Sequence, residues 1–379
     1  MKAADRLAHI QEYYFSKKLR EVRALAAQGK PIINLGIGSP DMSPPEEVIS
    51  ALQHSLQDTG AHKYQSYQGI PEFRSVIAEF YKSKYSVNLN MENEILPLMG
   101  SKEGILHISM AFLNKGDEVL IPNPGYPTYT SVTTLVGARP IFYELSKEGG
   151  WQPDLEALGQ QDLSKVKLMW VSYPHMPTGA NAKEDTFKKL VAFGQKHQIL
   201  IVNDNPYSFI LNNTPKSILE VDGSKSVCLE LNSLSKSFNM AGWRVGMVLG
   251  SEEHINQILK VKTQMDSGMF YGIQKGGIAA LQLSKDWFEV QNKQYEKRRA
   301  LVWELAEKLN CTFDKETSGL FVWARLPEGK QSEEMIDTLL YDKSIFVAPG
   351  TVFGSQGEGY IRFSLCVPEE QIKEAINRI

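Results

Sequence analysis

The sequence predicts an α/β fold built on a mainly parallel sheet, and two observations support that prediction. Short runs rich in apolar residues alternate with helical patterns through the middle of the chain. Strands that are apolar along most of their length are typical of a parallel sheet covered by helices on both faces. The candidate strands are 96–99, 118–121, 167–171, 199–202, 227–231 and 245–249.

The last quarter of the chain has a different pattern. Val302, Leu305 and Leu309 recur at helical spacing, which predicts one long helix over 286–310. Short strand-like runs and one helix follow, which is typical of a smaller α+β unit. The expected elements of this unit are a strand at 319–324, a helix near 332–342 and a strand at 360–365.

These patterns divide the chain into two domains. Typical domains have about 100–200 residues, so the 379 residues of this chain suggest two or three. We expect a large domain over 45–285. A small domain would join 286–379 with the N-terminal arm 1–44.

Composition excludes several classes of protein. The net charge of −3 gives no reason to expect a nucleic-acid partner or an anionic membrane surface. No apolar run approaches the roughly 18–20 residues that a membrane helix needs, and the first fifteen residues do not resemble a signal peptide. The widely spaced Cys228, Cys311 and Cys366 predict buried free thiols, with no disulfide framework and no metal pattern. We therefore expect a cytoplasmic protein without a metal ion.

Polar and small residues collect where the predicted strands end. In open α/β sheets, ligands bind beyond the carboxyl ends of the strands. Each cluster alone is weak, because Ser and Gly dominate turns and Asp often caps a helix. Their joint occurrence predicts a binding site. The clusters are Gly100-Ser101-Lys102, Pro177-Thr178-Gly179, Asp204-Asn205-Pro206-Tyr207 and Ser233-Leu234-Ser235-Lys236.

The stretch 233–246, SLSKSFNMAGWRVG, resembles the S-x-S-K…G-x-R-x-G signature of class I/II pyridoxal-phosphate (PLP) aminotransferases. These are fold type I enzymes similar to aspartate aminotransferase. The resemblance extends from 34–41, NLGIGSPD, to Arg362. It implies PLP as cofactor, a seven-stranded type of mainly parallel sheet, and a homodimer with shared active sites.

The resemblance assigns Lys236 as the lysine that holds PLP as a Schiff base. An amine whose ammonium form is disfavoured by burial and neighbouring cations acts as a base near neutral pH. A phosphate also needs several donors, which a helix N-terminus and an arginine fork provide. The implied phosphate-binding residues are Gly100, Ser101, Lys102, Ser233 and Arg244, with Tyr64 reaching the phosphate of the neighbouring subunit.

The same resemblance implies roles for five further residues. Asp204 would face the pyridine nitrogen and keep the ring protonated, so that the ring withdraws electrons. Tyr207 would hydrogen-bond the ring hydroxyl, and Tyr126 would stack on the ring. Arg362 would hold the substrate α-carboxylate through two parallel hydrogen bonds. The backbone of Gly38 would approach the substrate.

One position departs from the family pattern. The family asparagine that donates to the ring hydroxyl aligns with Met176, whose thioether cannot donate a hydrogen bond. Without that donor, the pKa of the lysine–PLP Schiff base is expected to rise, unless His175 or a water substitutes.

Two reactions remain open from the sequence. The first is transamination, in which Lys236 removes the Cα proton of an L-amino acid and a 2-oxo acid receives the amino group. The alternative is another PLP reaction on the same scaffold, such as C–S lysis, decarboxylation or racemisation, because a fold does not dictate the reaction. An aminotransferase-like regulatory module that binds DNA is not expected of this slightly acidic chain. The identities of the amino donor and acceptor are not readable.

Overall fold

A seven-stranded sheet forms the centre of the structure, a computed structural model that describes residues 2–8, 10 and 12–379. Its order is β2-β8-β7-β6-β5-β3-β4, and only β8 runs against its neighbours. The α/β prediction with a mainly parallel sheet is therefore confirmed. The strands are β2 (Ile95–Leu98), β3 (Glu118–Asn123), β4 (Arg139–Glu144), β5 (Val166–Val171), β6 (Leu200–Asp204), β7 (Cys228–Ser233) and β8 (Gly246–Leu249).

Helices cover both faces of this sheet. Because side chains alternate along a strand, Ile201 of β6 packs into one apolar cluster and Val202 into another. One face is covered by α4 (Ser101–Phe112), α5 (Pro127–Leu135) and α9 (Glu252–Lys262). The other is covered by α3 (Pro71–Tyr85), α7 (Thr186–His197) and α10 (Tyr271–Leu281), against which α2 (Glu46–Ser55) packs. The short helices α6 (Leu155–Gly159) and α8 (Leu234–Ser237) follow Asp154 and β7.

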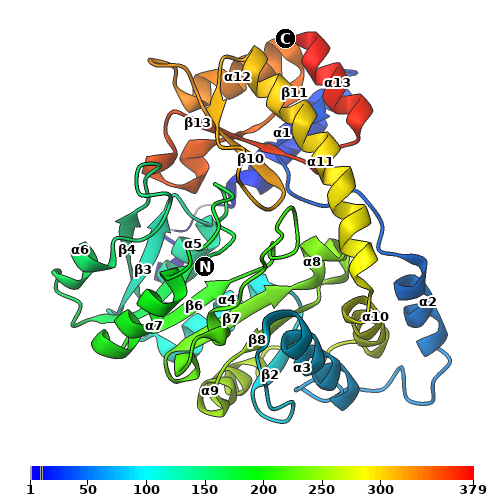
Figure 1. Cartoon of the computed structure of the whole chain (residues 1–379), viewed down its shortest axis with the longest axis vertical. Helices are drawn as coiled ribbons and strands as arrows, with labels where there is room; N and C mark the ends of the chain where they lie inside the picture. The colour runs from blue at the N-terminus through cyan, green and yellow to red at the C-terminus, as the bar shows by residue number, and fades with distance from the viewer. Residues whose placement is uncertain (1, 9, 11) are drawn as a thin grey trace.

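The long helix α11 (Lys285–Lys308) runs from the region of α10 to a second, smaller unit (Figure 1). This unit contains an antiparallel sheet of order β12-β13-β10-β9. The N-terminal segment joins the same unit, since β1 (Ile33–Asn34) pairs in parallel with β11 (Ile345–Phe346). The other elements are α1 (Tyr14–Ala27), β9 (Thr312–Phe313), β10 (Phe321–Arg325), α12 (Ser332–Lys343), β12 (Ala348–Pro349), β13 (Tyr360–Ser364) and α13 (Glu369–Arg378).

Strand β4 is the one strand of the large sheet that the sequence pattern did not indicate. It lies at the sheet edge, where Phe142 is 50% exposed and Pro140 removes a backbone donor. An edge strand with proline lacks the continuous apolar run of the buried strands. The three cysteines are free and buried, as predicted. In the described residues, no helix is long and apolar enough to cross a membrane.

Candidate active site

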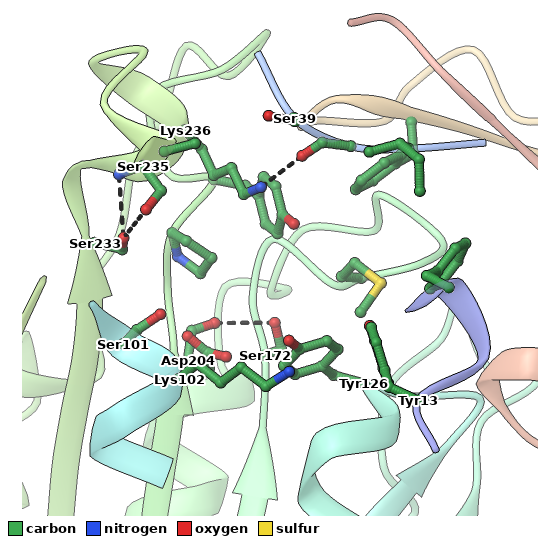
Figure 2. A pocket seen from close by; sticks show the side chains of 18 of the residues that line it. Tyr13, Ser39, Ser101, Lys102, Tyr126, Ser172, Asp204, Ser233, Ser235 and Lys236 are labelled. Atoms are coloured by element: carbon green, nitrogen blue, oxygen red, sulfur yellow. Dashed lines mark hydrogen bonds between the residues drawn. The ribbon is translucent and has the colours of Figure 1, made fainter. Parts of the chain in front are cut away.

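A cavity of about 490 Å³ lies beyond the carboxyl ends of the central strands, where α1 and the smaller unit meet them (Figure 2). This volume is in the range of small-molecule sites. The cavity brings together ten of the residues that the sequence predicted. They are Gly38, Ser101, Lys102, Tyr126, Asp204, Tyr207, Ser233, Lys236, Arg244 and Arg362.

Asp204 is the last residue of β6, and its carboxylate is buried at the cavity wall. Tyr129 donates a hydrogen bond of 2.8 Å to Oδ2, while Oδ1 is buried without a partner. Burial raises the pKa of Asp204 to about 6, although the Tyr129 bond and the charge of Lys236 oppose that rise. A buried carboxylate with one unsatisfied oxygen is suited to a cationic or N–H donor ligand.

Lys236 lies across the cavity from Asp204 (Figure 2). It belongs to α8, whose first turn is capped because the Ser233 hydroxyl accepts from the Ser235 backbone N–H at 3.1 Å. The Lys236 ammonium donates to the Gly38 carbonyl at 2.5 Å. Burial, assisted by the positive charges of Arg362 and Arg244, lowers the pKa of Lys236. This environment favours a neutral amine, which is the nucleophilic and basic form.

A group of donors without a carboxylate partner surrounds the start of α4. Ser101 begins this helix, so its first backbone N–H groups and the positive helix end face the cavity. A Cβ at Gly100, where φ is +90°, would lie 2.1 Å from Arg244 Nη2, so this close approach requires glycine. Within the described residues, Arg244 forms no ion pair; its Nη1 donates to the Ala241 carbonyl at 2.8 Å. The arrangement is suited to a phosphate.

Arg362 is a buried cation, 4% exposed, and none of the ion pairs in the described part of the chain includes it. Its Nη2 donates to the Gly36 carbonyl at 2.9 Å, and its Nη1 lies 3.4 Å from Met176 Sδ. The Phe321 ring centroid is 3.8 Å from the guanidinium carbon. Burial lowers the pKa of Arg362 to about 10. A buried guanidinium without an anion is costly, so a carboxylate ligand would stabilise it.

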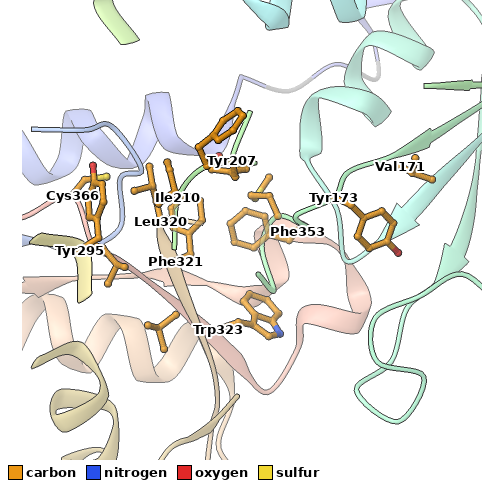
Figure 3. Packing of buried hydrophobic residues seen from close by; sticks show 14 of the residues in the cluster. Val171, Tyr173, Tyr207, Ile210, Tyr295, Leu320, Phe321, Trp323, Phe353 and Cys366 are labelled. Carbon is orange, nitrogen blue, oxygen red and sulfur yellow. The ribbon is translucent and has the colours of Figure 1, made fainter. Parts of the chain in front are cut away.

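Aromatic side chains form much of the remaining wall. The Tyr207 and Phe321 rings lie edge to face with centroids 5.8 Å apart, and Phe353 packs in the same cluster (Figure 3). Burial raises the pKa of Tyr207, so its hydroxyl stays protonated. Tyr126 precedes α5 and lies edge to face with Tyr129 at 5.5 Å. These rings can contact a planar ligand.

Three residues that the sequence connected with the cofactor do not line the cavity of this chain: Gly100, Tyr64 and His175. Tyr64 is 90% exposed, so it does not reach the cavity of its own chain. His175 is buried behind the wall, and its Nδ1 lies 2.8 Å from the Thr178 hydroxyl. Burial lowers the pKa of His175 to about 3, which keeps the ring neutral. Met176, by contrast, does line the cavity.

Sequence reasoning missed Tyr129 and Tyr13. Tyr129 lies one helical turn after Tyr126, and its ring stacks on Trp170 with centroids 4.8 Å apart. Tyr13 comes from the N-terminal arm and packs against the Lys102 ammonium, 4.4 Å from its ring centroid. The spacing to Tyr126 was a usable signal for Tyr129. No local pattern connects Tyr13 to a site formed some 90 residues later.

Taken together, the residues fit PLP. The cavity holds an amine of lowered pKa, a buried carboxylate oxygen without a partner, and hydrogen-bond donors from the start of α4 and from Arg244. The α/β fold and this site define a PLP-dependent enzyme whose substrate carries a carboxylate.

Comparisons with known proteins identify the family. The family model for aminotransferase class I and II matches residues 30–379. The LL-diaminopimelate aminotransferase of Aquifex aeolicus (strain VF5) is 39% identical, over 99% of this chain and 98% of that protein. The substrate-bound structure of BacF from Bacillus subtilis has a TM-score of 0.94 at 34% identity, covering 100% and 97% of the two chains. An aromatic aminotransferase from Pyrococcus horikoshii OT3 has a TM-score of 0.89 at 28% identity, covering 99% and 96%.

The chain therefore belongs to the class I and II aminotransferases, and its fold is fold type I. It is a PLP-dependent aminotransferase, which moves an amino group from an amino acid to a 2-oxo acid. Of the two reactions that the sequence left open, the relatives support transamination over lysis, decarboxylation or racemisation.

Proposed function

We propose that Lys236 holds PLP as a Schiff base and, once displaced by the substrate amine, moves the proton at the substrate Cα. Two features support this role. Lys236 lies in the cavity with a lowered pKa, and Asp204 presents a buried oxygen without a partner to the same cavity. The second of these is the observation that carries the proposal, because a carboxylate there matches the protonated pyridine nitrogen.

Bound PLP supplies a carbonyl carbon that accepts amines and a ring that withdraws electrons from the substrate. The protein residues do the positioning. We propose that Arg362 would bind the α-carboxylate, Asp204 would place a negative charge at the ring nitrogen, and Tyr207 would donate to the ring hydroxyl. Tyr126 would contact the ring face. The phosphate would bind at Gly100, Ser101, Lys102, Ser233 and Arg244. The Gly38 carbonyl, which accepts a hydrogen bond from the free Lys236 amine in the cofactor-free protein, would lie close to the substrate.

Borohydride reduction of the PLP-loaded protein tests this assignment. The expected result is one stable PLP label on the peptide that contains Lys236, located by mass spectrometry. Lys236→Ala should carry no label and lose turnover by several orders of magnitude, since both nucleophile and base are removed. Lys102→Ala, which removes the other cavity lysine, should keep the label at Lys236. A label elsewhere, or near-native turnover in Lys236→Ala, would refute the assignment.

We also propose that the enzyme is a homodimer in which Tyr64 reaches the phosphate of the partner site. Its 90% exposure supports this, because Tyr64 lies among other exposed apolar side chains, and a patch of such side chains is typical of a protein interface. The neighbouring exposed apolar side chains belong to three segments that contact one another, 64–70, 97–99 and 265–274. The Ile70 N–H donates to Gln274 at 2.8 Å, and Gly69 lies against Pro97. These side chains are Tyr67 (42%), Met99 (38%), Met265 (54%) and Phe270 (45%).

For the amino donor, two candidates have specific support. LL-diaminopimelate is the first to test, because the name of the Aquifex aeolicus relative contains it. An amino acid with an aromatic side chain is the second, because the rings of Phe15 and Phe353 line the cavity with centroids 5.5 and 4.6 Å from the Arg362 guanidinium carbon. A panel of both kinds with 2-oxo acids, followed by mass spectrometry, separates them.

Two further proposals complete the assignment. The domain division at 45–285, with 1–44 and 286–379 as the second domain, is supported by the separate sheets that the two parts contain. A cytoplasmic location is supported by three cysteines that are all free.

A further inference from the structure

Glu230 is a buried carboxylate with no part in the chemistry described above. It lies in the middle of β7 and is 0% exposed. None of the ion pairs in the described residues includes it. Such a carboxylate costs free energy unless donors satisfy it, so its surroundings indicate what it is for.

Four groups donate to this carboxylate. The Tyr81 hydroxyl donates to Oε1 at 2.9 Å, and the Asn205 amide donates to the same oxygen at 3.3 Å. The Asn203 amide and the Ile218 backbone N–H donate to Oε2 at 3.3 and 3.0 Å. Both oxygens are therefore satisfied, by residues from three different parts of the chain.

The network is connected directly to two of the proposed cofactor residues, Asp204 and Ser233. Asn203 and Asn205 flank Asp204 on either side. The Asn232 amide donates to the Tyr81 oxygen at 2.8 Å, and Asn232 Oδ1 accepts from the Ser233 backbone N–H at 2.7 Å. The Glu230 carboxylate thus connects the end of β6, next to Asp204, with the end of β7 at Ser233.

The sheet itself separates this network from the cavity. Successive side chains of a strand point to opposite faces, so Asn203 lies on one face and Asp204 on the other. Glu230 contacts neither the cavity nor its proposed ligands. Burial raises the pKa of Glu230 to about 7, even though the hydrogen bonds from its donors oppose that rise. The groups that face it are otherwise neutral hydroxyl and amide groups, with Cys228 on the same strand.

We propose that Glu230 is a positioning residue for transamination, which fixes the Asp204 carboxylate and the Ser233–Lys236 segment from the opposite face of the sheet. Through Asn203 and Asn205, which flank Asp204, it fixes the position of the Asp204 carboxylate relative to the ring nitrogen. Through Tyr81 and Asn232 it sets the start of the lysine-bearing turn. This inference rests on the proposed roles of Asp204, Ser233 and Lys236.

Substitution of Glu230 tests the inference, with a matched buried glutamate as control. Glu230→Gln keeps the shape but turns one acceptor into a donor, and Glu230→Leu removes both acceptors. Glu118 on β3 of the same sheet is also buried (7% exposed), but it pairs with Arg139 at the amino end of its strand, away from the cavity. Glu118→Gln therefore reports the cost of perturbing the sheet alone.

The readouts are the PLP dissociation constant of the apoenzyme, kcat, and KM for the amino acid. We expect Glu230→Gln to weaken PLP binding about tenfold and to lower kcat, since each lost hydrogen bond is worth roughly a factor of ten. KM should stay within about twofold, because Arg362 on β13 is untouched. Glu118→Gln should lower the melting temperature without changing the PLP dissociation constant.

Three outcomes decide the matter. Unchanged PLP binding and kcat in folded Glu230→Gln would overturn the inference, as would equal effects in Glu118→Gln. If the Glu230 variants do not fold, Tyr81→Phe removes one donor and the link to Asn232; PLP binding and kcat that stay at wild-type values in Tyr81→Phe would overturn it as well. Failure of the proposed function is separate, because it appears in the wild type as a missing label at Lys236.

Discussion

At the scale of single residues, the two oxygens of Asp204 have different surroundings. Oδ2 accepts the Tyr129 hydrogen bond and Oδ1 has no partner. The position of Asp204 at a strand end was readable from the sequence. The hydrogen bond was not, because Tyr129 comes from another element 75 residues earlier. What a carboxylate does depends on such a partner as much as on its own place.

Tyr129→Phe tests this partner. The lost hydrogen bond favoured the carboxylate, so the pKa of Asp204 in the cofactor-free protein should rise above its present value of about 6. A higher pKa leaves less carboxylate at pH 6 than at pH 8. We therefore expect PLP affinity to fall by about tenfold or more at pH 6 and by less at pH 8.

The control for this experiment is Tyr143→Phe. Tyr143 is also buried, but it donates to the Trp170 carbonyl at 2.7 Å and not to Asp204. Its loss should lower stability and leave the pH dependence of PLP binding unchanged. Equal losses at both pH values in Tyr129→Phe would show that the tyrosine acts by packing alone.

Met176 is the second residue whose surroundings matter. Its sulfur contacts Arg362 Nη1 at 3.4 Å inside the cavity, and it offers no donor to the cofactor hydroxyl. Met176→Asn introduces such a donor, which stabilises the deprotonated form of the lysine–PLP Schiff base. The pH midpoint of the cofactor absorption change should therefore lie lower in Met176→Asn than in the wild type. A spectrophotometric pH titration that gives an equal or higher midpoint would contradict this.

At the scale of elements, the sequence predicted what each strand end presents but not how distant segments meet over it. Lys236, Asp204 and Ser101 follow apolar runs, and local spacing was enough to find them. The segment 34–41 lies over Lys236 because of contacts far apart in sequence. Arg298 of α11 binds Asp41 through two hydrogen bonds of 2.6 and 2.9 Å. Contacts of this kind depend on tertiary packing, for which a single sequence carries no periodic signal.

Asp41→Asn tests the importance of this contact. Arg298 is 4% exposed, so removal of its anion leaves a buried cation with one carbonyl partner, Leu365. We expect a loss of about 2–3 kcal/mol in the free energy of unfolding. Because the Gly36 carbonyl of the same segment contacts Arg362, KM for the amino acid should also rise.

Urea denaturation and steady-state kinetics measure both effects. Asp185→Asn is the control, since the Asp185–Lys189 pair has the same short distance, 2.6 Å, but is exposed. Because the pair is exposed to solvent, its loss should leave both the free energy of unfolding and KM nearly unchanged. A stability loss in Asp41→Asn as small as in Asp185→Asn would mean that the Arg298 contact does not hold the segment.

At the scale of the whole molecule, the sequence predicted the mainly parallel α/β sheet and most of the residues that gather at one cavity. Edge strand β4 and the meeting of arm, cavity and smaller unit could not be predicted, because they depend on which surfaces face one another. The proposed role of Tyr64 could not be read from sequence spacing either, because it depends on which surfaces of two chains face one another. Its exposed ring lies outside the cavity of its own chain, so only an assembly can bring it to a phosphate.

Mixed dimers test the assembly directly. If the proposed roles hold, Tyr64→Ala and Lys236→Ala subunits are each defective alone, the first in phosphate binding and the second in chemistry. In a mixed dimer with shared sites, the site that retains Lys236 receives Tyr64 from the other subunit, while the second site lacks both. One of its two sites is therefore intact, because the two substitutions fall in the same defective site.

We expect the purified mixed dimer, isolated through two different affinity tags, to recover about half of the wild-type kcat with wild-type PLP affinity at that site. If Tyr64 served its own chain, each site would carry one defect and no activity would be recovered beyond that of the Tyr64→Ala parent. A mixture of subunits that gives no mixed dimer at all, with each species sedimenting as a monomer, would refute the homodimer itself.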